Sequence, residues 1–214
     1  MFDQAAGLRR RSTGPLLHAI HCRFEASGDA ACLAAALAAH GRRSLLIHTR
    51  DTPLDAATPR PLFDWRAQLA RGEIAPLPAA FGAVWHAPGL QEDTPLLHAA
   101  ARAYDLLLID AATDEAALLT LAAARQDHVI AVGQPEAARV AAYAVLKTLA
   151  SQPAVSRVFL LGDAAAQERV HAACRRFLDD AFCQRIECVT EAGDEFATLA
   201  VRMMREETSV RART

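Results

Sequence analysis

The chain has 214 residues, of which 52% are hydrophobic and 22% are charged, and its formal net charge at pH 7 is −2. This length and apolar fraction suit one domain with a full core, and the near-neutral charge excludes the basic footprint of a nucleic-acid-binding protein. No apolar run approaches the roughly 20 residues that cross a bilayer, and the charged start lacks a signal-peptide core, so we expect a cytoplasmic protein.

The first 13 residues form a short segment that is set apart by Gly14-Pro15. The segment combines polar residues, an apolar edge and a basic end: Asp3, Gln4, Ala5, Leu8 and Arg9. A piece this short does not hold a helix by itself in water. Its composition and its place ahead of the domain predict a segment that becomes ordered on a partner.

After this segment, short apolar runs alternate with helical patterns. Strands are predicted at 16–20, 44–48, 83–86, 105–110, 128–132, 156–161 and 185–189. Helices are predicted at 29–40, 61–71, 95–103, 114–125, 135–150, 164–180 and 194–207. This alternation predicts a doubly wound α/β fold, with a mostly parallel sheet of about seven strands flanked by helices. We expect a single domain over 14–207 and a disordered tail over 208–214.

In a sheet of this kind, ligands bind at the carboxyl ends of the strands, and a nucleotide needs a glycine-rich turn after the first strand. That turn, 21–29, contains one glycine, Gly28, and no lysine. Lys147 is the only lysine of the chain and lies in a later helix, while the carboxylates of Glu25 and Asp29 would repel phosphate. Arg23 is the remaining source of positive charge. The turn therefore argues against ordinary P-loop binding.

Several parts of the chain resemble a known family. Residues 3–9, Asp-Gln-Ala-Ala-Gly-Leu-Arg, resemble the DQAxxLR activator segment of the FlhG (FleN) family, the MinD/ParA-like regulators of flagellar number. Residues 105–110 resemble the strand that carries the family's magnesium-site aspartate, which would be Asp110. Residues 134–136 and 142–147 resemble the family's T-x-P-E segment and its A-Y-A-L-I-K helix. The resemblance implies a MinD/ParA-like fold over nearly the whole domain.

The chain departs from the family's pattern at the nucleotide contacts. The P-loop is rewritten at 22–29, His48 stands where the family has an aspartate, and the switch glycine and base-reading asparagine are missing at 111–113 and 161–163. The resemblance thus implies a degenerate nucleotide site without catalytic residues, at the following positions: Arg23, Gly28, His48, Asp110, Pro135 and Glu136. We expect neither ATP nor Mg²⁺ to bind there.

The resemblance implies a non-catalytic regulator of flagellar biosynthesis, number and placement. It would bind the signal-recognition-type GTPase FlhF and stimulate GTP hydrolysis: Gln4 would help position the water, Leu8 would anchor the apolar edge, and Arg9 would contact acidic or phosphate groups. Recruitment to the cell pole or flagellar base would follow. Two alternatives stay open, namely an active MinD-like ATPase that uses Arg23 and Asp110, and a scaffold for flagellar or polar proteins without an activator role.

Metal and membrane sites have weaker support in the sequence. His18 and His21 lie three residues apart, so on a strand they point to opposite faces and do not form a zinc site with Cys22. The five cysteines are odd in number and lack CxxC spacing, which is typical of reduced thiols. The last predicted helix has an apolar stripe between Phe196 and Met204; membrane contact and packing on the sheet are both open, and packing is favoured.

Overall fold

The computed structural model describes residues 17–24, 26, 28–48, 60–61, 82–86, 104–111, 124–152, 155–190 and 193–211. In this part of the chain, eight strands form one sheet in the order β3-β4-β2-β5-β1-β6-β7-β8, and every neighbouring pair is parallel. They are β1 (Leu17–Arg23), β2 (Ser44–His48), β3 (Arg60–Pro61), β4 (Gly82–His86), β5 (Leu106–Asp110), β6 (Ala124–Val132), β7 (Val155–Gly162) and β8 (Ile186–Val189). The parallel α/β sheet that the sequence predicts is confirmed, with eight strands in place of about seven.

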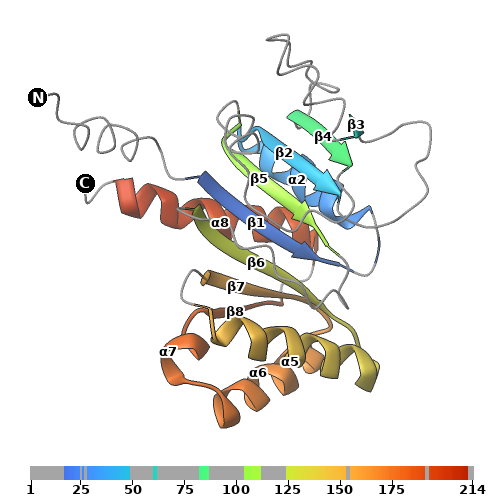
Figure 1. Cartoon of the computed structure of the whole chain (residues 1–214), viewed down its shortest axis with the longest axis vertical. Helices are drawn as coiled ribbons and strands as arrows, with labels where there is room; N and C mark the ends of the chain where they lie inside the picture. The colour runs from blue at the N-terminus through green and yellow to red at the C-terminus, as the bar shows by residue number, and fades with distance from the viewer. Residues whose placement is uncertain are drawn as a thin grey trace, which may run out of the picture.

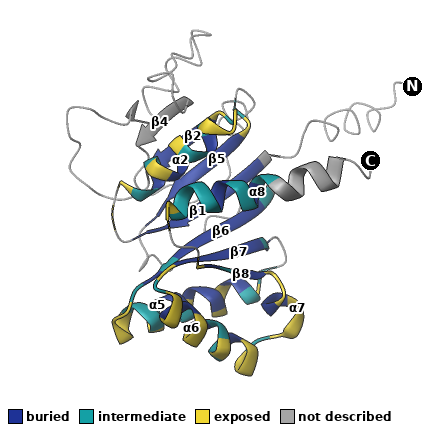
Figure 2. Ribbon diagram, turned by 180° about the vertical axis from the view of Figure 1, so that it is seen from behind, coloured by how far each residue is buried: buried dark blue, intermediate teal, exposed yellow. Residues whose placement is uncertain are grey.

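The direction in which the chain moves across the sheet reverses at β3: the chain runs from β1 through β2 to β3 at one edge, then returns through β4 and β5, past β1, to β6, β7 and β8. β2 and β4 follow on one side of β1, and β6, β7 and β8 follow on the other. The helices described are α2 (Asp29–Ala39), α5 (Glu136–Ala150), α6 (Ala164–Phe177), α7 (Asp180–Cys183) and α8 (Glu195–Arg211). Because crossovers between parallel strands are right-handed, opposite directions place their helices on opposite faces. Figures 1 and 2 accordingly show α2 and α5 on opposite faces of the sheet.

Each face of the sheet carries its own apolar core. On one face, α2 and α8 pack against the strands and against each other, and Leu33, Leu37 and Met203 are fully buried there. On the other face, α5, α6 and α7 cover β6 to β8, with Leu146 and Val170 in the core. All five residues of β5 are buried, as expected for a strand that is covered on both sides.

Two predicted boundaries near strands are wrong. β6 begins at Ala124, four residues before the predicted start at His128, because the charged side chains of Arg125 and Asp127 bond to each other and to a neighbouring strand. Pro61, which was predicted to begin a helix, lies in β3 next to His86 of β4.

Two helices also end elsewhere than predicted. α6 stops at Phe177 rather than at 180, because Leu178 is extended and the carboxylate of Asp179 accepts a hydrogen bond from the Ala181 N–H at the start of α7. α8 continues to Arg211, beyond the predicted end at 207, and no glycine or proline interrupts it. The part of the predicted tail from 208 to 211 is therefore helical.

Some predictions fall outside the described residues. They include the partner-binding segment 1–13, with Asp3, Gln4, Ala5, Leu8 and Arg9, and the last three residues of the chain. The predicted helices at 95–103 and most of those at 61–71 and 114–125 also lie there.

Candidate functional site

The carboxyl edge of the central strands brings two of the predicted site residues together. Asp110 at the end of β5 is in register with Cys22 of β1 on one side and with His48 of β2 on the other. The Ala111 N–H donates a hydrogen bond of 2.9 Å to the Cys22 carbonyl, which ties the ends of β5 and β1 together. The Asp110 side chain is fully buried beside this edge. The strand that carries the aspartate is thus the direct neighbour of the strand that leads into the degenerate turn.

The turn after β1 places a phenyl ring in the core at this point. Phe24 is 1% exposed and packs edge-on against Phe196 of α8, with ring centroids 5.7 Å apart. Gly28 has φ −85°, a conformation open to other residues, and a Cβ added to it would meet no atom within 4 Å. A glycine of a phosphate cradle serves close backbone approach or positive φ, and Gly28 shows neither feature.

Carboxylates gather where α2 and α8 begin. Burial and the neighbouring carboxylates of Asp29 and Asp194 raise the pKa of Glu195 above its usual range. The Asp194 carboxylate caps α8 by accepting hydrogen bonds of 3.1 Å from the N–H groups of Phe196 and Ala197. Three acidic side chains therefore lie close together at the beginning of these two helices. A phosphate beside α2 would meet negative charge, which opposes the favourable field of a helix N-terminus.

Arg23 lies in a different environment from the beginning of α2. Its side chain is 1% exposed, and its charge is among the causes that lower the pKa values of His21 and His128. His21 and His128 are paired across β1 and β6, and their rings stack with centroids 4.5 Å apart. Burial is the largest cause, and the pKa of His21 falls to about 4. Both imidazoles are consequently neutral at pH 7, and Arg23 is buried near them.

The remaining predicted site residues lie at the ends of β6 and β7. Pro135 caps α5, Glu136 begins it, and the Gln134 side-chain amide donates a hydrogen bond of 3.0 Å to Asp163 after β7. Asp163 also accepts a hydrogen bond of 2.8 Å from the Ala166 N–H, and these two bonds, that from Gln134 first, lower its pKa. The strand order places β1 between β5 and β6, so Asp110 and Glu136 stand at the ends of strands that do not touch.

Sequence reasoning missed a buried polar cluster in the sheet. The Asp127 Oδ2 atom accepts hydrogen bonds from His18 Nε2 at 2.9 Å and from Arg157 Nη2 at 2.7 Å, and Arg125 lies 3.4 Å away. Burial would raise the pKa of Asp127, but the bonds from His18 and Arg157 outweigh it and hold the pKa below its usual range. The charged residues Arg125 and Asp127, two positions apart and directly before the strand predicted at 128–132, are the signal that could have revealed this cluster.

The buried polar cluster includes His18, one of the three residues considered as zinc ligands in the sequence. His18 bonds to Asp127, whereas His21 stacks on His128. Within the described ranges, no three His, Cys, Asp or Glu side chains are grouped so as to hold a metal ion. No helix of the described part is long and apolar enough to cross a membrane.

No protein-family model matches the chain, and no curated protein matches it. The functional interpretation consequently depends on the residues themselves.

Proposed function

We propose that the protein is a degenerate, FlhG-like member of the MinD/ParA-like regulators that regulates flagellar number and placement without hydrolysing ATP. Its fold would be that of P-loop NTPases without a working P-loop. The observation that supports this most is the turn after β1, where Phe24 is buried in the core beside the strand that ends in Asp110. The carboxylates of Asp29 and Glu195 add to it, because they disfavour phosphate at the beginning of α2.

The proposed activity belongs to the segment 1–13, which would order as a helix on a flagellar FlhF-type GTPase. Asp3 and Gln4 would lie at the GTP site, where Gln4 helps to position the hydrolytic water. Leu8 would anchor the apolar edge, and Arg9 would contact acidic or phosphate groups. These roles come from the resemblance of residues 3–9 to the DQAxxLR segment. A segment that folds only on its partner loses entropy on binding, so we expect modest affinity.

A regulator without an ATP switch responds to its own concentration. The family's ATP-dependent dimer would be absent, and GTPase stimulation would rise with the amount of this protein in the same way with or without ATP. The degenerate positions Arg23 and Gly28 would not contact a nucleotide, in keeping with the burial of Arg23 and the open surroundings of Gly28.

The test is the GTP turnover of the FlhF-type GTPase from the same cell, measured with the full chain and with a chain that lacks residues 1–11. We expect stimulation by the full chain and its loss on truncation. Asp3→Ala combined with Gln4→Ala should abolish it as well, whereas Ser12→Ala is the matched control within the same segment. Adding ATP and Mg²⁺ should change nothing.

Three results would contradict the proposal. Full stimulation by the truncated chain would move the activity elsewhere in the molecule, and no stimulation by either chain would favour the scaffold function. Saturable, Mg²⁺-dependent ATP binding that disappears in Asp110→Ala would establish the active ATPase instead.

A further inference from the structure

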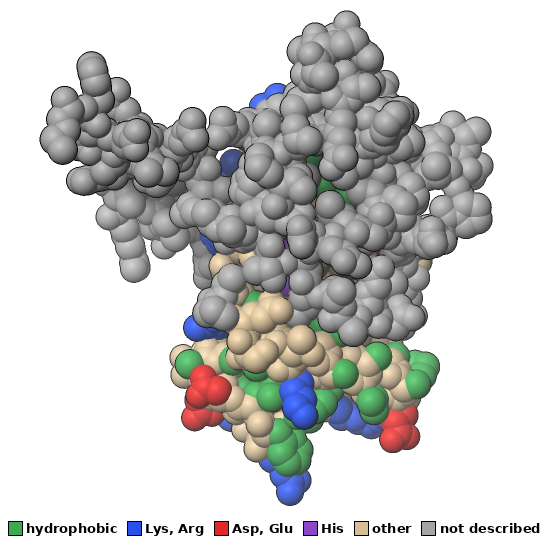
Figure 3. Space-filling view, in the orientation of Figure 1, with side chains coloured by type: hydrophobic (Ala, Val, Ile, Leu, Met, Phe, Trp, Pro, Cys, Tyr) green, Lys and Arg blue, Asp and Glu red, His purple; other side chains and the backbone are tan. Residues whose placement is uncertain are grey.

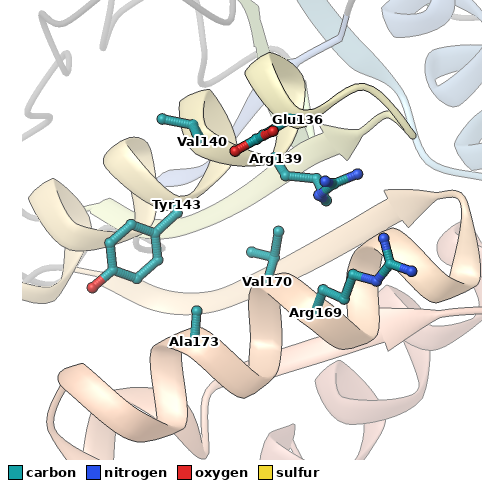
Figure 4. A pocket seen from close by; sticks show the side chains of 7 residues that line it. All are labelled: Glu136, Arg139, Val140, Tyr143, Arg169, Val170 and Ala173. Carbon is teal, nitrogen blue, oxygen red and sulfur yellow. The ribbon is translucent and has the colours of Figure 1, made fainter.

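An open groove runs between α5 and α6, on the face of the sheet opposite α2 and α8. Figure 4 shows side chains from both helices pointing into it. The groove has a volume of about 290 Å³ and is lined by Glu136, Arg139, Val140, Tyr143, Arg169, Val170 and Ala173. Val140 is 60% exposed, which is unusual for a large aliphatic side chain.

The apolar lining continues along α6. Phe177 lies one helical turn after Ala173 and is 65% exposed, and the Arg176 guanidinium stacks on its ring at 5.2 Å from the centroid. Val140 and Phe177 are the exposed large hydrophobic residues of the described part, and they stand on the two helices that flank this groove. Single exposed hydrophobic residues are ordinary, but two beside one apolar groove indicate a contact surface.

The rim of the groove is positively charged. Arg139 and Arg169 line it, Lys147 lies one turn after Tyr143, and Arg176 stands beside Phe177. Glu136 is the single acidic residue of the lining. Two cations and one anion line the groove itself, Lys147 and Arg176 add positive charge beside it, and the Asp163 carboxylate interacts with Arg169. The charge around the groove is therefore net positive, whereas the formal net charge of the whole chain is −2. Figure 3 shows basic and apolar side chains in this part of the surface, with acidic side chains at its two sides.

We propose that the groove between α5 and α6 binds an acidic amphipathic helix of a partner protein. A helix that packs in the groove between two others is a common mode of recognition, and it would place apolar side chains at i, i+3 or i+4, and i+7 over Val140 and Tyr143. From Glu136 to Tyr143 the groove measures about 10 Å along α5, at 1.5 Å per residue, which is the length of two helical turns. Carboxylates on both sides of that apolar stripe would meet the cationic rim.

Charge and shape favour an acidic partner helix over two other occupants of the groove, a second copy of the chain and a bilayer. A second copy of the chain would bring one cationic rim against another, which disfavours a symmetric dimer through this face. A bilayer is flat, whereas the apolar side chains here line a hollow between two helices (Figure 4). The proposal does not depend on residues 1–13, so it stands or falls separately from the GTPase activity proposed above.

The test selects a library of random 16-residue peptides, displayed on phage, against the full chain. We expect the selected peptides to contain more Asp and Glu than Lys and Arg, with apolar residues at helical spacing. Synthetic copies should lose at least tenfold in affinity for Val140→Glu and for Arg169→Glu. Ala35→Glu is the matched control, because it adds the same charge at an exposed position of α2, on the opposite face of the sheet and away from the groove. Phe177→Ser serves as a second groove variant, and thermal unfolding checks that each variant folds.

Other outcomes overturn the proposal. Selected peptides that bind Val140→Glu as well as they bind the unchanged protein would place the site elsewhere, and basic peptides would contradict the charge argument. A concentration-dependent dimer that Val140→Glu dissociates would assign the groove to a second copy. Binding to phosphatidylglycerol vesicles that the same change removes would assign it to a membrane surface.

Discussion

The two helical layers of the sheet present different surfaces. In the α2–α8 layer, the turn after β1 sends Phe24 into the core against Phe196, and acidic side chains gather where both helices begin. In the α5–α6 layer, the two helices share a core and leave between them a surface groove in which Val140 is largely exposed. At the carboxyl edge, where this fold class commonly holds a ligand, Phe24 is buried and acidic side chains lie nearby, whereas the open apolar surface lies on the opposite layer.

The difference in packing between the two layers can be tested by truncating one side chain in each layer to alanine. Phe24→Ala should lower the free energy of unfolding by about 4 kcal/mol, because it leaves a cavity among well-packed side chains. Val140→Ala should change it by less than about 0.5 kcal/mol, because the side chain is 60% exposed. Urea unfolding of both variants measures the contrast. Equal losses would mean that the two layers are packed alike.

The buried polar cluster of the sheet is tested at Asp127. Asp127→Asn keeps the size of the side chain but removes the charge that His18 and Arg157 share, and it should cost about 3 kcal/mol at pH 7. Because the folded pKa of Asp127 lies below its ordinary value, this stabilisation is present above pH 4 and disappears as the pH falls through the folded value. The control Arg125→Ala should cost under about 1 kcal/mol, since its contact is longer and its side chain is partly exposed. A cost for the control that matches the cost of Asp127→Asn would contradict this account.

The stacked pair of His21 and His128 predicts a second pH dependence of the free energy of unfolding, in a higher pH range than that of Asp127. The folded pKa of His21 is about 4, below the ordinary value of 6.5, so the unfolded chain binds a proton that the folded chain does not. Stability from this residue is therefore complete above pH 6.5 and falls by about 3 kcal/mol as the pH drops toward 4. His21→Gln should flatten the stability profile over this range in urea titrations at several pH values. A variant profile parallel to that of the unchanged protein would disprove the assignment to His21.

Elements of the fold could be predicted from the sequence where the local hydrophobic pattern matches the burial of the residues in the structure. The continuous apolar run of β5 and the proline before α5 predicted those elements correctly, because parallel strands are covered on both faces and proline suits the start of a helix. The start of β6 was missed because Arg125 and Asp127 interrupt the apolar pattern. The charge of Asp127 is stabilised by hydrogen bonds from His18 of β1 and Arg157 of β7, which lie far away in sequence.

The candidate site could be predicted only in part. Sequence spacing placed Asp110 at the end of a buried strand, and the order of the strands, which brings it beside Cys22, follows from long-range pairing. The burial of Arg23 beside two neutral imidazoles could not be foreseen, because His128 comes from a strand more than one hundred residues later. The groove likewise depends on how far apart α5 and α6 lie, which hydrophobic spacing within either helix does not specify.

The smallest predicted difference concerns two glycines at the carboxyl edge of the sheet, Gly162 and Gly28. Gly162, where β7 ends, has φ +111°, and a Cβ there would lie 2.8 Å from the Val132 carbonyl oxygen, so only glycine fits between the ends of β6 and β7. Gly162→Ala should cost about 2 kcal/mol in the free energy of unfolding. Gly28→Ala, in the turn before α2, should change it by less than about 0.5 kcal/mol, because that glycine has negative φ and open surroundings. If Gly28→Ala proved as costly as Gly162→Ala, the turn after β1 would have a conformational requirement of the kind that a phosphate cradle imposes, and the ATPase alternative would regain support.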